Sequence, residues 1–346
     1  MARVRTFRDF TGLVQSVLES DERRQGEFGI QAPTQLKAYL VEARGTSPRD
    51  QGSPSGPWIP LDTRGWFVAE SDSEPHTFFL DATDPRVWKM YSLRDATESH
   101  RMVDKWVSIW RGLDHCWLTR SQLLHWEGEA TWQRRGLGLK FSDGLTPEEE
   151  QENFSLKAWY GASRRLASLE EILARAQEQF AINSVRWQKL AGGSVSLSAE
   201  WYSDGTVTFN RAASVEDAML AVTSMANRYS DDLTRATELR DSTLGAFEVD
   251  FSQPVGLAEF SEVVAKGGGP MRLWMLETES SDQIKRFSGV DMHSWDRVLI
   301  DLASDHAFVT VPGAGCVNAV PRIATLQGED NAGKTEILFD GEPVFA

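Results

Sequence analysis

The stretch Val195-Ser-Leu-Ser-Ala-Glu-Trp-Tyr-Ser-Asp-Gly-Thr-Val-Thr-Phe209 decides the fold of this chain. Apolar and polar residues alternate from Val195 to Tyr202, which is the period of a half-buried β-strand. Ser203-Asp204-Gly205 then supplies residues that suit a tight turn, and the alternation resumes after it. Together with residues 185–190, which precede a Gly-Gly break, the stretch predicts an antiparallel β-meander.

A long helix is predicted directly after this meander. Ser214 can cap its N-terminus, and Glu216 and Asp217 suit the positive end of the helix dipole. The apolar positions of one helix face follow at spacings of three and four residues: Val215, Met219, Val222, Ala226, Tyr229 and Leu233. Gly245 is the predicted stop, so the helix has ~30 residues and either crosses a whole domain or bends.

The rest of the chain alternates short helices and strands. Further helices are predicted at residues 6–20, 96–111, 168–180 and 257–264. Further strands are predicted at residues 35–43, 66–69, 77–80, 87–93, 136–141, 154–159, 247–251, 271–276, 297–302, 307–311, 322–326 and 336–339. Ser168 and Glu171 form a capping box, and residues 118–126 fit either type of element. The acidic run at 147–152 is expected to be a solvated turn or a helix start.

These patterns predict an α+β protein with antiparallel or mixed sheets and packed helices, divided into two domains. The predicted segments are a helix–strand unit at 1–45, an exposed loop or linker at 46–57, a Trp-rich α+β region at 58–165, a helix, meander and long helix at 166–245, and a mainly β region with one β-α-β connection at 246–346. Residues 46–57 are assigned as a loop because they are rich in Ser, Pro and Gly.

Composition limits the class of protein. The chain has 346 residues, of which 41% are hydrophobic, and this is enough for a sizeable core. No stretch approaches the ~20 apolar residues that span a bilayer, and no apolar signal-peptide region follows the basic N-terminus, so we expect a cytoplasmic protein without membrane contact. Cys116 and Cys316 are too few for a disulfide framework and have no metal-ligand spacing.

The net charge of −15 opposes nucleic-acid binding, because phosphate contacts need clustered Lys and Arg. An acidic chain with 13 tryptophans instead suits specific contacts with other proteins. We therefore expect a protein partner or a homo-oligomer, and we assign no cofactor. A local basic patch remains the one route to nucleic acid.

The segment Gly328-Glu-Asp-Asn-Ala-Gly-Lys-Thr335 matches the letter pattern of a phosphate-binding P-loop. Such a loop follows a strand and opens a helix, whose N-terminal amides contact the phosphates. Only residues 336–346 follow here, and they predict a strand and a turn. We therefore interpret the segment as a β-hairpin loop without nucleotide binding.

A dense set of Asp and His side chains is the candidate catalytic site. Asp291, His293 and Asp296 lie in one short segment, followed by Asp305 and His306. Alternate residues of an extended segment project to one side, so Asp291 and His293 can form an acid–base pair or ligate a metal. Because no second His or Cys stands at a recognised ligand spacing, we assign no metal. If the segment is only a loop, changing Asp291 and His293 to alanine leaves the melting temperature nearly unchanged.

A second candidate surface combines aromatic and basic residues. Its members are Trp126, Trp132, Arg120, Arg134 and Arg135. Exposed tryptophans would stack on bases while the arginines contact phosphates. Alternatively the tryptophans belong to the core, which the helical spacing of Trp106 and Trp110 favours.

The leading hypothesis is a non-catalytic intracellular binding or interaction subunit of a larger assembly. One alternative is a metal-dependent hydrolase or nuclease that uses Asp291, His293 and Asp296. The other is a single-stranded nucleic-acid binder that uses the Trp and Arg residues of 106–135. Bound metal would favour the first alternative, and tight, salt-sensitive binding of single strands would favour the second.

Overall fold

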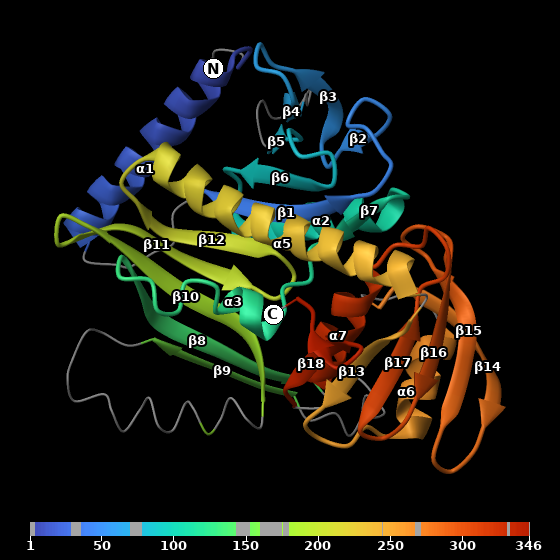
Figure 1. Cartoon of the computed structure of the whole chain (residues 1–346). Coiled ribbons are helices and arrows are strands. Elements are labelled where there is room, and N and C mark those ends of the chain that lie inside the picture. Colours follow the sequence, from blue (N-terminus) through green and yellow to red (C-terminus); the bar gives the residue numbers. More distant parts are fainter. Residues whose placement is uncertain are drawn as a thin grey trace. The chain divides into compact units, whose positions relative to one another are not determined.

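The computed structural model describes residues 4–28, 36–69, 78–142, 153–159, 175, 180–243, 245–266, 271–330 and 333–345. Within these ranges the chain forms six helices and two β-sheets whose neighbouring strands run antiparallel (Figure 1). The predicted α+β class with antiparallel sheets is therefore confirmed.

Contacts divide the chain into two compact units, each built from segments that are separate in sequence. The first unit contains Met1–Cys116, His125–Arg134 and Arg186–Ser230, and the second contains Trp117–Leu124, Arg135–Val185 and Asp231–Ala346. The division into the five sequence segments 1–45, 46–57, 58–165, 166–245 and 246–346 remains a prediction. The acidic run at 147–152 and the predicted helix that begins at Ser168 lie outside the described residues.

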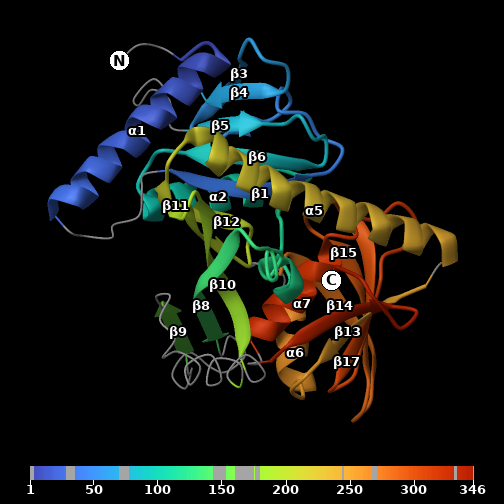
Figure 2. The same cartoon turned by 60° about the vertical axis from the view of Figure 1, so that its left-hand side comes forward.

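The first unit is built on one antiparallel sheet. Its elements are α1 (Phe7–Phe28), β1 (Lys37–Ala43), β2 (Gly52–Ser53), β3 (Gly56–Pro60), β4 (Trp66–Ala69), β5 (Phe78–Asp81), β6 (Val87–Ser92), α2 (Ala96–Ile109), β7 (Leu113–His115), β11 (Ser194–Tyr202), β12 (Thr206–Ala212) and part of β10 (Ala181–Ala191). The strand order is β2-β3-β4-β5-β6-β1-β12-β11-β10, and β7 pairs with β1. Figure 2 shows β3, β4, β5, β6 and β1 one below another in this order.

The predicted meander is confirmed as β10, β11 and β12. In its register, Ala199 lies opposite Phe209 and Trp201 lies opposite Val207. Gly205 lies in the turn before β12 with φ of +76°, and a Cβ there would come within 2.8 Å of the Cys116 carbonyl oxygen. Only glycine therefore suits this turn, both for its backbone angle and for the space beside it.

The predicted long helix is also confirmed, as α5 (Val215–Thr243), which has 29 residues. The Ser214 hydroxyl accepts a hydrogen bond from the Asp217 amide at 3.1 Å, so Ser214 is the N-cap that the sequence predicts. The start of α5 belongs to the first unit and its end to the second. Leu244, the last residue before the predicted stop, lies outside the described residues.

The second unit contains a seven-stranded antiparallel sheet in the order β14-β15-β16-β17-β13-β18-β19. Its elements are α3 (Arg120–Leu123), β8 (Trp132–Ser142, from Arg135), β9 (Asn153–Trp159), β13 (Phe247–Phe251), α6 (Leu257–Lys266), β14 (Leu273–Ser280), β15 (Lys285–Asp291), β16 (Asp296–Leu302), β17 (His306–Thr310), α7 (Ala319–Asp330), β18 (Thr335–Phe339) and β19 (Glu342–Pro343). Strands β15, β16 and β17 lie between β14 and β13, and each neighbour runs antiparallel to the next, so β13 and β14 run in the same direction. Helix α6 connects these two strands and forms the predicted β-α-β unit.

One predicted strand is wrong. Residues 322–326 belong to helix α7 and not to a strand. Every residue from Ala319 to Ala324 is buried, so this part of α7 has no exposed face. Periodicity alone does not distinguish a helix from a strand in a short run that is buried throughout.

The ambiguous segment 118–126 contains the short helix α3, whose N-cap Thr119 forms a capping box with Gln122. Residues 153–159 pair with 136–142 as β9 and β8, which confirms both predicted strands. Among the helices that the structure describes, none is both long and apolar enough to cross a bilayer.

Candidate functional site

Asp291 and His293 lie at the turn between β15 and β16, on the buried side of the sheet. Asp296 begins β16 and lies opposite Asp291 in the register. Nη2 of Arg322 on helix α7 is 2.6 Å from Oδ1 of Asp291, and both side chains are buried. Nδ1 of His293 is 3.7 Å from Oδ2 of Asp291. The structure therefore brings Asp291 and His293 together, and it adds Arg322.

Arg322 changes what Asp291 can do chemically. Burial alone would raise the pKa of Asp291, but the guanidinium of Arg322 and the hydrogen bond and charge of His293 outweigh it and hold the pKa well below its usual range. A carboxylate so firmly ionised is a weak proton acceptor at neutral pH. The arrangement holds α7 against the hairpin as a buried ion pair.

Asp305 and His306 lie at the other end of β16 from Asp291. They form a partly exposed pair, with His306 Nδ1 2.8 Å from Asp305 Oδ1. Strand β16 has 7 residues, each of which rises ~3.3 Å, and it separates this pair from Asp296. The five candidate residues thus form two groups rather than one site.

Trp126 is a core residue, with 2% of its surface exposed. It stacks on Trp132 at 4.4 Å between ring centroids, lies 5.0 Å from Trp201, and packs edge-on to Trp187. Arg134 forms an ion pair with Glu127 at 3.4 Å. Arg120 and Arg135 are assigned to the second unit, whereas Trp126, Trp132 and Arg134 belong to the first.

The P-loop-like segment has the reverse order of elements from a nucleotide site. Gly328 and Asp330 end helix α7, and Thr335 begins strand β18. A strand before the glycines and a helix after them are what phosphate binding requires. The segment is also not the hairpin loop that we expected, because it connects a helix to a strand.

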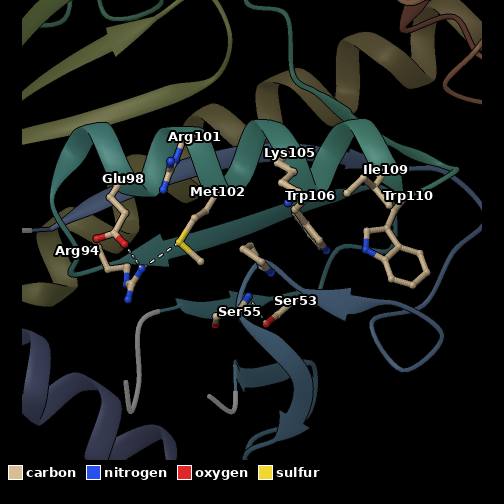
Figure 3. Close-up of a pocket in the computed structure, with 11 residues that line it drawn as sticks. Ser53, Ser55, Arg94, Glu98, Arg101, Met102, Lys105, Trp106, Ile109 and Trp110 are labelled. Atoms are coloured by element: carbon tan, nitrogen blue, oxygen red, sulfur yellow. Dashed lines mark hydrogen bonds and ion pairs between the residues drawn. The ribbon is translucent and has the colours of Figure 1, made fainter. Parts of the chain in front are cut away.

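A groove beside helix α2 is a candidate binding site within the first unit (Figure 3). Its volume is about 670 Å³, and we call it the α2 groove. It is lined by Ser53, Pro54, Ser55, Arg94, Glu98, Arg101, Met102, Lys105, Trp106, Ile109 and Trp110. This volume is in the range of pockets that hold small ligands or a few residues of a peptide.

Two walls form the α2 groove. One wall is helix α2, where Asp95 caps the N-terminus by accepting bonds from the Thr97 and Glu98 amides. The other is the β2–β3 hairpin, whose turn places Ser53 and Ser55 below the helix. Figure 3 shows Met102, Trp106 and Trp110 on the side of α2 toward this hairpin.

The lining is positively charged, with three cationic side chains and one carboxylate. Arg94 Nη1 pairs with Glu98 Oε1 at 2.7 Å and contacts the Met102 sulfur at 3.0 Å, which fixes its guanidinium at one end. Arg101 and Lys105 are exposed, one helical turn apart, and in the part of the chain that the structure describes neither forms an ion pair. These two cations are available to an anionic ligand.

The apolar floor of the groove is continuous with the core. Trp106 is 3% exposed and lies edge-on to Trp58 at 6.1 Å. Its Nε1 donates a hydrogen bond to the carbonyl oxygen of Gly52. Trp110 and Ile109 close the C-terminal end of α2, and 63% of Ile109 is exposed. The groove thus offers apolar surface beside its cations.

The sequence pattern does not reveal this site, because its two walls, residues 53–55 and 94–110, are far apart along the chain. Residues 46–57 looked like a linker, yet they contain β2, and Gln51 is only 8% exposed. Trp106 is buried in the core, as its spacing indicated, whereas Trp110 is half-buried and lines the groove. Arg101 and Lys105 beside them, four residues apart, were the available sign of a cationic helix face.

Comparison with known proteins identifies a family whose model covers most of this chain. The model of the MJECL33-like protein family matches residues 22–328. A protein of Methanocaldococcus jannaschii described as "Uncharacterized protein MJECL33" is 21% identical over 346 residues, which covers 83% of this chain and 82% of the relative. No solved structure matches this chain.

Proposed function

This chain belongs to the MJECL33-like protein family, and we propose that it is a non-catalytic binding subunit whose α2 groove holds an acidic segment of a protein partner. The observation that carries this function is the pair Arg101 and Lys105, which stand exposed and without ion pairs in the described residues. They lie on a chain of net charge −15, so they mark a local exception to its overall charge. Opposite charge on a partner gives specificity and faster association.

The chemistry of the walls supports a polypeptide ligand. Trp106, Trp110 and Ile109 provide apolar area next to the cations, and aromatic residues with arginine are typical of the centres of protein interfaces. The Ser53 hydroxyl lies on the opposite wall, where it accepts a hydrogen bond from the Ser55 amide at 3.1 Å and can donate its proton to a carbonyl of an extended peptide. An acidic segment with one or two apolar side chains matches both features.

The two alternative functions have less support. Asp291 is engaged with Arg322, which leaves a hydrolase without its expected base. Trp126 is engaged in the core, which removes a stacking platform from a single-strand binder. An acidic peptide thus remains the ligand that the exposed groups favour.

Fluorescence anisotropy with labelled peptides tests this function. The probes are a peptide of alternating Asp/Glu and Leu/Phe residues, the same peptide with Lys in place of the acids, and a single-stranded dT oligonucleotide. We expect the natural chain to bind the acidic peptide, and Arg101→Glu with Lys105→Glu to weaken this binding by roughly tenfold or more. The effect should shrink with added salt, because screening reduces exposed charge interactions.

A matched variant controls for net charge. Arg8→Glu with Arg64→Glu makes the same charge change at exposed residues of the first unit that do not line the groove. This variant should bind the acidic peptide as the natural chain does. If both double variants bound the acidic peptide equally weakly, the loss would reflect only long-range repulsion and not the groove. If the natural chain bound the Lys peptide or the oligonucleotide more tightly than the acidic peptide, the proposed ligand would be refuted.

A further inference from the structure

Strand β14 is an open edge of the seven-stranded sheet in the second unit. The strand order begins with β14, and among the described residues only β15 pairs with it. The backbone groups on its outer side are therefore available for a further strand. Natural edges are usually blocked by charge, proline or a bulge, and the first half of β14, Leu273-Trp-Met-Leu276, contains none of these.

The side chains of this half strand divide between two faces. Leu273 and Met275 are buried on the face that α6 covers. Trp274 and Leu276 point to the other face, where 51% and 59% of their surfaces are exposed. Such large apolar side chains at a sheet edge favour association with another chain.

The apolar surface continues across the sheet from this edge. In the register, Trp274 lies beside Val290 of β15. Leu276 lies beside Ser288 of β15, and Ser288 in turn lies beside Leu299 of β16. Phe308 on β17 is also 39% exposed, and its partner in the register is Asp301. We call the exposed side chains of Trp274, Leu276 and Phe308, together with the half-buried Val290 and Leu299, the open face.

We propose that β14 pairs antiparallel with β14 of a second copy of this chain, which joins the two sheets edge to edge. Pairing centred on Met275 places Trp274 of each copy opposite Leu276 of the other, on the open face. Both apolar side chains then lose exposure together, and aromatic–aliphatic pairs across strands are stabilising. A two-fold interface of this kind is self-complementary by symmetry.

The register itself favours a second copy over an unrelated strand, because two identical strands present Trp274 and Leu276 to each other on the same face. Glu277 and Glu279 at the end of β14 pair with Lys285 and Arg286 of their own chain, which reduces the repulsion between the acidic strand ends of two copies. The register shift between Glu277 and Glu279 then ends the pairing, because a bulge disrupts the ladder.

Molecular mass in solution is the first test. Light scattering coupled to size exclusion should give a dimer for the natural chain, with the fraction of monomer rising on dilution. Trp274→Glu should be monomeric, because it places two carboxylates at the paired edge, and its far-UV circular dichroism should match the natural chain. A monomer at every concentration, or a dimer that Trp274→Glu does not weaken, would overturn the proposal.

Disulfide trapping tests the register independently of folding defects. Trp274→Cys and Leu276→Cys are prepared separately and mixed under mild oxidation, so that a link between the two variants can form only between copies. The natural Cys116 and Cys316 are buried and give little background. We expect the mixture to form a disulfide-linked dimer more readily than either variant alone, because directly opposite residues lie within disulfide range.

A mixture of Trp274→Cys with Leu220→Cys is the control, since Leu220 is also exposed, at 63%, but lies on α5. This mixture should form no more linked dimer than chance collisions produce. Equal linking in the control and the test mixture, or no linking in either, would contradict pairing through β14.

Discussion

The Trp106 indole nitrogen donates a hydrogen bond to the carbonyl oxygen of Gly52, and this bond joins the two walls of the α2 groove. Gly52 also lies against Trp110, because a Cβ at this position would be 3.5 Å from Trp110 Cζ2. The helix and the hairpin are therefore held in place without a ligand. Such preorganisation reduces the entropy that a bound peptide would otherwise lose.

Trp106→Phe should destabilise the protein by about 1–3 kcal/mol, because it leaves the Gly52 carbonyl without its donor while keeping an apolar ring. Urea unfolding measures this loss. Trp110→Phe is the matched control and should cost less, since in the described residues Trp110 makes no side-chain hydrogen bond. Equal stability of Trp106→Phe and the natural chain would show that the bond does not hold the walls.

Asp291→Ala should lower the free energy of unfolding by about 3–5 kcal/mol, because it removes the carboxylate that pairs with the buried guanidinium of Arg322 at 2.6 Å. The sequence-based expectation for a plain loop was an unchanged melting temperature, and the buried ion pair reverses it. Asp301→Ala removes a half-exposed carboxylate from Arg286 and should cost only about 0–1 kcal/mol. Elemental analysis decides the hydrolase alternative: metal lost together with stability would favour it.

Asp104→Asn should reduce stability mainly at acidic pH. Burial alone would lower the pKa of His115, but its hydrogen bond with Asp104 and the charge of Asp204 outweigh burial, and the pKa is raised above 6.5. Because the pKa of His115 is higher in the folded protein, protonation of His115 stabilises the fold. This contribution is complete below pH ~6.5, the pKa in the unfolded chain, and it is lost as the pH rises through the pKa in the folded protein.

Melting temperatures measured between about pH 5 and pH 9 check this dependence. The difference between the natural chain and Asp104→Asn should be largest at the acidic end and should vanish at the alkaline end. Asp50→Asn, at an exposed position outside this cluster, should shift the melting temperature without this trend. A constant difference across the range would exclude His115 as the titrating group.

Binding to single-stranded DNA or RNA should be negligible at physiological salt. The charge of −15 opposes approach, Trp126 is buried, and Arg134 is paired with Glu127. Anisotropy titration with a labelled oligonucleotide measures this affinity. Tight binding that Arg134→Ala with Arg135→Ala abolishes would instead favour the nucleic-acid function.

Local periodicity determined a large part of the fold. The meander from β10 to β12 and the start of α5 at Ser214 were predicted because strand alternation, turn glycines and helix caps act between near neighbours in sequence. Residues 322–326 were misassigned because the residues from Ala319 to Ala324 are all buried, and a short buried run has no period that separates a helix from a strand.

The candidate site depended on tertiary structure. The sequence predicted that Trp106 faces a core and showed that Asp291 and His293 are close along the chain, but it did not show that Arg322 on helix α7 neutralises Asp291. Nor did it establish that residues 52–55 form a wall opposite Arg101 and Lys105. Burial, ion pairing and grooves arise between segments distant in sequence, whose approach is set by packing of the whole unit and not by the pattern within either segment.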